Sequence, residues 1–122
     1  MEDFNLIIKE LISKEMNGQI PQELIPRLEE TAENYLKKGE LDDAIKVFIL
    51  TKNQEKLREL GKRALKEKKL ESAFFALKNT GDKETINLLG MEFMKQTELK
   101  NALESFKIAQ NQEMIEFLLK NF

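Results

Sequence analysis

Apolar residues recur along the chain at intervals of three and four residues, the spacing that places side chains on one face of an α-helix. The first such stripe lies within residues 4–16 and consists of Phe4, Ile7, Ile8, Leu11 and Ile12. Gly18 follows it, and glycine tolerates the left-handed conformation that ends a helix. Pro21 and Pro26 suit a first helical turn better than a helix interior. We therefore expect a capping helix and a connector within residues 1–25.

From Leu28 onward the pattern repeats every 29 residues. Equivalent positions of successive units hold similar side chains: Leu28, Leu57, Ile86 and Ile115; Ala32, Gly61 and Gly90; Ala44, Ala73 and Ala102; Phe48, Leu77 and Phe106. Asn53, Asp82 and Asn111 stand at the unit boundaries, where such side chains can accept hydrogen bonds from the free N–H groups of a helix start. We expect repeats at residues 28–56, 57–85 and 86–114, and a final helix at residues 115–122.

Each repeat is expected to contain two helices of about 11 to 14 residues, with breaks near residues 38–39, 68–69 and 96–97. The small residue of the first helix and the alanine of the second would let the two backbones approach, with Leu57, Leu60 and Leu65 filling the surrounding space. One such pair cannot bury its apolar faces alone, so consecutive pairs are expected to stack into an α-solenoid. The helices at the two ends would cap the stack.

The order of residues within the units resembles the tetratricopeptide repeat. The second and third units carry it best, with Leu57, Leu60-Gly61, Ala64, Ala73, Leu77 and Thr80, and with Ile86, Leu89-Gly90, Phe93, Ala102, Phe106 and Ala109. The family's repeat is about 34 residues long and ends in a proline that is missing here. The shorter units look closer to those of vesicle-coat and ciliary-transport subunits. The resemblance implies an all-α, right-handed solenoid of three tetratricopeptide-like hairpins that binds proteins and catalyses nothing.

The composition narrows the chemistry further. The chain has no cysteine, histidine or tryptophan, which excludes a disulfide framework, a thiolate nucleophile, an imidazole base and metal sites built on these side chains. Carboxylate pairs such as Glu29/Glu33 and Glu55/Glu59 are ordinary on exposed helix faces, and no glycine-rich phosphate loop is present. We expect no enzymatic activity, no cofactor and no metal.

The sequence offers no membrane segment. Its longest apolar run, residues 47–50, is four residues long, whereas a membrane span needs about 20. The acidic start, Met1-Glu2-Asp3, does not resemble a signal peptide. A cytoplasmic location is therefore expected.

Charge is distributed unevenly, although the net charge is only −2. Residues 1–43 sum to −6, residues 44–83 to +6 and residues 84–122 to −2. By the resemblance, the first helices of the units line a concave face, where a basic strip would consist of Lys37, Arg58, Lys62, Lys66 and Lys95. We interpret this strip either as the site for an acidic protein segment or as a solvated face. A nucleic-acid site is the alternative, although the strip lacks aromatic residues for stacking bases.

Some apolar residues stand at positions where the other repeats have polar ones. Others lie near the C-terminus, where the last helix is apolar over most of its circumference. These interface candidates are Phe75, Leu88, Met91, Met114, Phe117 and Phe122. Ile49, with Val47 and Leu50, is instead expected to lie beneath the N-terminal helix. Because exposed apolar patches mark interfaces, we expect either a homodimer through the C-terminal helix or the docking of an amphipathic partner helix. The chain is predicted to be a small adaptor, with a self-assembling structural subunit as a further alternative.

Overall fold

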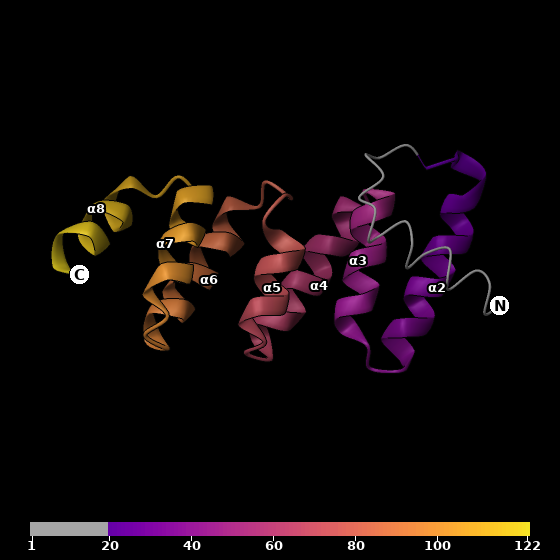
Figure 1. Ribbon diagram of the computed structural model, residues 1–122, viewed down its shortest axis with the longest axis horizontal. Helices are drawn as coiled ribbons and strands as arrows, with labels where there is room; N and C mark the ends of the chain where they lie inside the picture. Colours follow the sequence, from indigo (N-terminus) through magenta and orange to yellow (C-terminus); the bar gives the residue numbers. More distant parts are fainter. Residues whose placement is uncertain (1–19) are drawn as a thin grey trace. The chain divides into compact units, whose positions relative to one another are not determined.

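The computed structural model describes residues 20–122, and over that range it contains helices joined by short turns and no strand (Figure 1). The expected capping helix at residues 4–16 lies outside the described residues. A 3₁₀ turn at Gln22–Leu24 is followed by seven α-helices: α2 (Ile25–Lys37), α3 (Leu41–Thr51), α4 (Gln54–Lys66), α5 (Leu70–Leu77), α6 (Lys83–Lys95), α7 (Leu99–Ile108) and α8 (Gln112–Asn121). Pro26 lies in the first turn of α2, as its missing N–H and fixed φ favour.

The helix bounds reproduce the period of the sequence. The first helices α2, α4, α6 and α8 begin 29 residues apart, and so do the second helices α3, α5 and α7. The turns between first and second helices fall at the expected breaks. Two second helices are shorter than expected, with 8 residues in α5 and 10 in α7. After α5, the Thr80 hydroxyl donates to the Leu77 carbonyl at 2.7 Å and accepts from the Asp82 N–H, so a side chain stabilises a turn there instead of another helical turn.

The predicted helix caps are confirmed. The N–H groups of Lys56, Thr85 and Met114 donate to the side-chain oxygens of Asn53, Asp82 and Asn111 at 3.1, 3.2 and 3.1 Å. These bonds satisfy N–H groups at the starts of α4, α6 and α8 that have no partner inside the helix.

Six residues of the described range adopt left-handed backbone conformations, and they too follow the period. One set, Gly39, Lys68 and Thr97, lies between the first and second helices, and the other, Lys52, Gly81 and Gln110, follows the second helices. In the first set the next residue donates back into the helix: the Glu98 N–H, for example, reaches the Phe93 carbonyl at 2.9 Å. Glycine is the usual residue in such a conformation, yet four of the six positions hold a residue with a side chain.

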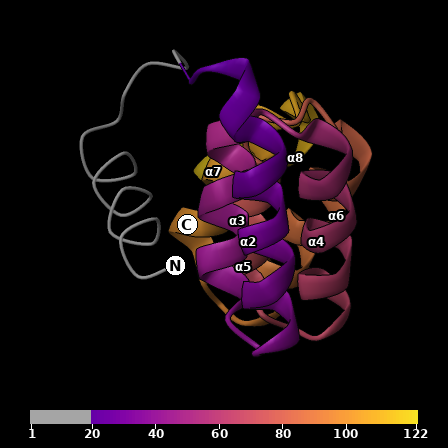
Figure 2. The ribbon, with the colours of Figure 1, turned by 90° about the vertical axis from the view of Figure 1, so that its right-hand side faces the viewer.

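The described residues divide into two compact units, one ending at residue 57 and the other comprising residues 58–122, and the boundary falls inside α4. In the first unit, α2 and α3 lie side by side in both views (Figure 1, Figure 2). In the second unit, α5 packs against α6, α6 against α7, and α7 against α8. Most repeat positions expected in the core are buried in both units, among them Leu28, Ala44, Phe48, Ala73, Leu77, Ile86, Ala102 and Phe106. Ile115, in α8, is only half-buried.

The small residues of α4 and α6 face large side chains of the following helix. A Cβ atom added to Gly90 would lie 2.8 Å from Cε1 of Phe106, and one added to Gly61 would meet the Leu77 side chain. The expectation that the small residue lets two backbones meet near the alanine was therefore incomplete, because its nearest neighbour is a bulky side chain. Leu65, expected to fill the space between helices, is only half-buried.

Candidate functional site

The second unit contains an open groove formed by α4 and the start of α6. Its volume is about 420 Å³, and it is lined by Lys62, Leu65, Lys66, Asp82, Glu84, Thr85 and Leu88. Lys62 and Lys66 lie one helical turn apart on α4, so both reach the same face. Asp82 caps α6, and its carboxylate also accepts from the Thr85 hydroxyl at 2.9 Å. The groove thus combines two lysines, two carboxylates and two leucines on a helical scaffold.

The two lysines of the groove differ in their surroundings. Lys62 Nζ lies 4.0 Å from Asp82 Oδ2, at the limit of an ion pair. Lys66 is exposed and has no ion pair with any residue of the described range. Leu88, on α6, is 53 % exposed, and Leu65 lies beside Lys66 on α4. One unpaired ammonium group therefore lines the same groove as the exposed Leu88 and the half-buried Leu65.

Most other cations between residues 56 and 69 are paired. The ion pairs are Lys56–Glu33 at 3.0 Å, Arg63–Glu67 at 3.3 Å, Lys69–Glu67 at 3.4 Å and Lys68–Glu92 at 2.9 Å. Hydrogen bonds from Lys68 and Lys95 lower the pKa of Glu92, and those from Arg63 and Lys69 lower the pKa of Glu67. The segment is less positive than its sequence suggests, because carboxylates from outside it compensate part of its charge.

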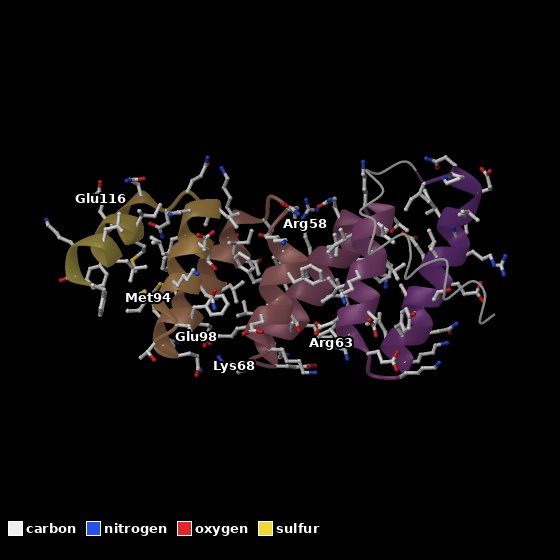
Figure 3. All side chains as sticks on the ribbon, viewed as in Figure 1. Arg58, Arg63, Lys68, Met94, Glu98 and Glu116 are labelled. Atoms are coloured by element: carbon white, nitrogen blue, oxygen red, sulfur yellow. The ribbon has the colours of Figure 1, made fainter. Side chains whose placement is uncertain are left out.

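Arg58 has a structural partner inside its own unit. Its guanidinium group donates to the Thr80 carbonyl at 3.3 Å. Figure 3 shows Arg58 near one end of α4, with Arg63 and Lys68 near the other. Arg58 therefore lies apart from the other charged side chains labelled on this segment.

The positions equivalent to Arg58 make comparable contacts, and we call Glu29, Arg58 and Asn87 the tie column. Glu29 accepts from Thr51 Oγ1 at 2.8 Å and from Asn53 Nδ2 at 3.0 Å. Asn87 accepts from Asn111 Nδ2 at 2.6 Å. Each member thus links a first helix to the turn after the second helix. The sequence analysis did not predict this role. The only sign of it in the sequence is that the position of Arg58 holds a polar side chain in every repeat.

Lys37 and Lys95 also fall outside the groove. Lys37, Lys66 and Lys95 are the last residues of α2, α4 and α6, where a positive charge interacts favourably with the helix dipole. Lys95 pairs with Glu92 at 3.2 Å, and Lys37 belongs to the other unit. Of the five residues predicted for a basic strip, the structure brings only Lys62 and Lys66 together in a groove.

The apolar candidates separate into two groups. Leu88, Met91, Phe117 and Phe122 are exposed by 53, 41, 45 and 76 %. Phe75 and Met114 are half-buried, and the Lys78 ammonium lies 5.4 Å from the centre of the Phe75 ring. Sequence reasoning missed Leu119, which is 66 % exposed. The signal was available, because Leu119 stands at the repeat position of Gly61 and Gly90.

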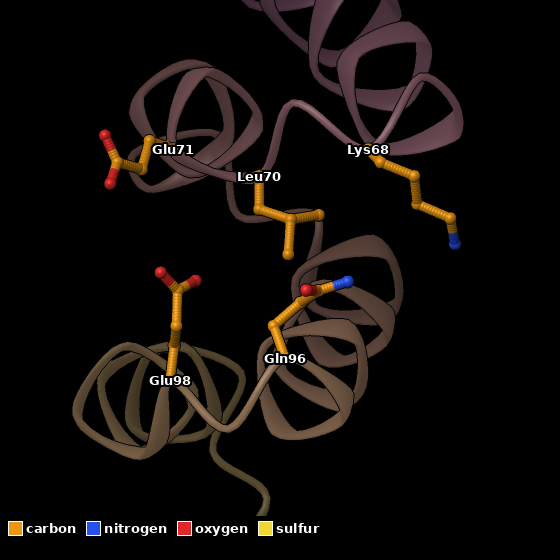
Figure 4. A pocket seen from close by; sticks show the side chains of 5 residues that line it. All are labelled: Lys68, Leu70, Glu71, Gln96 and Glu98. Carbon is orange, nitrogen blue, oxygen red and sulfur yellow. The ribbon is translucent and has the colours of Figure 1, made fainter.

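A second, smaller cavity lies at the turns of the same unit. It has a volume of about 290 Å³ and is lined by Lys68, Leu70, Glu71, Gln96 and Glu98 (Figure 4). Lys68 points away from Leu70 and the two carboxylates, in keeping with its ion pair to Glu92. With one apolar side chain, this cavity offers less to a partner than the groove of α4 and α6.

Residues 20–122 hold neither a cluster of metal ligands nor a membrane span. Within that range no three or more Asp and Glu side chains come closely enough together to hold a metal ion. None of the helices described there has the length and apolar character to cross a bilayer.

No family model, curated protein or solved structure matches this chain.

Proposed function

We propose that this chain is a tetratricopeptide-like adaptor whose groove of α4 and α6 binds an acidic, amphipathic segment of a partner protein. The observation that carries the proposal is the unpaired Lys66 ammonium beside Leu65 and the exposed Leu88. A carboxylate of the partner would pair with Lys66, and an apolar side chain one helical turn away would cover the leucines. Fixed helices reduce the entropy lost on binding.

The regular helix bounds support the proposal that the chain is a helical-repeat protein. Helix pairs that recur every 29 residues are typical of proteins in which consecutive pairs stack and present extended binding surfaces. We therefore propose the right-handed solenoid of helical hairpins as the arrangement of the whole chain. Binding, rather than catalysis, is the role that such a scaffold and these side chains favour.

The test uses a fluorescein-labelled helical peptide that carries glutamate and leucine on one face. Lys66→Glu should weaken binding by about three- to tenfold, because an exposed attraction becomes a repulsion. Fluorescence anisotropy at two salt concentrations measures the loss, which should shrink at the higher concentration.

The matched control is Lys107→Glu. Lys107 is exposed and lies in the last turn of α7, so both substitutions oppose a helix dipole, but only Lys66 lines the groove. Equal losses in the two variants, or equal binding of a peptide with glutamine in place of glutamate, would refute the proposed groove.

A further inference from the structure

The groove of α4 and α6 has two walls of opposite charge. Lys62 and Lys66 line it from α4, and Asp82 and Glu84 line it from the N-terminal end of α6. Within residues 20–122, Lys66 and Glu84 form no ion pair with each other or with any other residue. A cation and an anion of the same groove are therefore both unpaired.

We propose that this groove prefers a partner segment of mixed charge, with a carboxylate on the flank that faces α4 and a lysine or arginine on the flank that faces α6. This inference rests on the proposed function and adds to it, because the acidic, amphipathic segment would need one basic residue. The apolar side chains of the segment would still cover Leu65 and Leu88.

Asp82 distinguishes this groove from the equivalent places of the other repeats. The caps of α4 and α8 are the neutral side chains of Asn53 and Asn111, whereas the cap of α6 is charged. Asp82 accepts from the Thr85 N–H at 3.2 Å and from the Thr85 hydroxyl at 2.9 Å. Asparagine caps a helix as well as aspartate does, so capping alone does not account for the charge.

The carboxylate of Asp82 limits what Lys62 can bind. Asp82 Oδ2 lies 4.0 Å from Lys62 Nζ, and the Asp82 side chain is only 15 % exposed. A partner carboxylate that approached Lys62 would also approach Asp82, so attraction and repulsion would partly cancel. Lys66 has no carboxylate partner within residues 20–122. The groove is therefore expected to bind one carboxylate well and a second one poorly.

Glu84 adds a second anion to the wall formed by α6. Glu55 and Glu113 hold the same place in the first turns of α4 and α8, where a negative charge interacts favourably with the helix dipole. Glu84 lies, in addition, in the groove beside Asp82, and it is exposed. A basic side chain of the partner that lies along this wall would be attracted by two carboxylates.

The experiment extends the peptide that tests the groove. The parent peptide carries one glutamate on its leucine face and glutamine at the other polar positions of that face. In one set of peptides lysine replaces glutamine three, four or seven residues before or after the glutamate, and in a second set glutamate replaces it. At one of these positions at least, lysine should strengthen binding to the full chain about two- to fivefold, and glutamate should weaken it.

Two variants of the chain test the anionic wall. Asp82→Asn keeps the cap in the form found in α4 and α8. It should reduce the preference for lysine and let the peptides with two glutamates bind more tightly, since Lys62 loses its partner. Glu84→Gln should reduce the preference for lysine as well. Its matched control is Glu113→Gln, which removes the same interaction with a helix dipole outside the groove and should leave the preference unchanged.

The results separate this proposal from the groove itself. If the parent peptide binds through Lys66 but lysine strengthens binding at none of the tested positions, the preference for mixed charge is overturned and the groove stands. The same holds if Asp82→Asn and Glu84→Gln both leave the preference for lysine unchanged. If no peptide binds, the groove is overturned and this proposal with it.

Discussion

At the scale of single residues, the turns contain the clearest conflict between side chain and backbone. Thr97 is exposed and has a φ of 59°. A left-handed conformation costs a residue with a Cβ about 1–2 kcal/mol, and β-branched side chains suit it least. Gly39, at the equivalent position of the first repeat, has a φ of 77°, and a Cβ added there would meet no other atom within 4 Å. The equivalent residue Gly39 therefore shows that glycine fits the position of Thr97.

Thr97→Gly should raise the free energy of unfolding by about 0.5–1 kcal/mol, the relief of strain less the entropy that glycine adds to the unfolded chain. Urea denaturation followed by circular dichroism measures the change. The neighbouring Gln96 has a φ of −87°, so Gln96→Gly should lower stability and serves as the control. A loss of stability in both variants would show that Thr97 is unstrained.

At the scale of helices, the contact within a pair depends on complementary sizes. Gly90 lies inside α6, where its intrinsic helix propensity is about 1 kcal/mol poorer than that of alanine. The ring of Phe106 occupies the space that a Cβ would need, at 2.8–3.0 Å, and Phe106 is fully buried. Helix propensity therefore favours alanine at position 90, whereas packing against Phe106 favours glycine. Because the contact is so tight, we expect packing to be the stronger effect.

Gly90→Ala should consequently lower the free energy of unfolding by about 1–2 kcal/mol, because overpacking a core costs more than the propensity gained. Chemical denaturation gives the value. Gly61→Ala, whose added Cβ would lie still closer to its neighbour, 2.3 Å from Leu77 Cγ, should lower the free energy of unfolding at least as much. A Gly90→Ala variant more stable than the parent would mean that α7 moves aside freely.

At the scale of the whole chain, the charge is uneven, but within residues 20–122 part of the positive charge is paired with carboxylates. The middle block of +6 contains Arg63, Lys68 and Lys69, all paired with carboxylates. Nucleic-acid affinity rises with the number of cations that meet phosphates, and paired cations contribute less. The ion pairs therefore favour a protein partner over a nucleic acid.

The chain should leave a heparin column below about 0.15 M salt, the ionic strength at which exposed charges are already well screened. The double variant Glu67→Gln, Glu92→Gln releases the cations from their partners and should be retained more strongly. Retention of the parent chain well above that salt concentration, unchanged in the variant, would revive the nucleic-acid interpretation.

The helical class, the period, the helix caps and the core could all be predicted from the order of the residues. Ala44, Ala73 and Ala102 recur at one position because the same local packing recurs, and a helix start needs the same cap each time. These features depend on neighbouring residues within one repeat, so the pattern of residues in a single sequence is enough to predict them.

Which side chains are free to bind became known only from the folded chain. Arg58 and Lys66 look equivalent as sequence, yet one holds the Thr80 carbonyl and the other lines an open groove. As sequence, Leu88 and Leu89 are two neighbouring apolar residues, and only the structure shows that the first is 53 % exposed and the second buried. The partners of Arg58 and Lys68 are more than 20 positions away in the chain, and a periodic pattern does not show where such side chains meet.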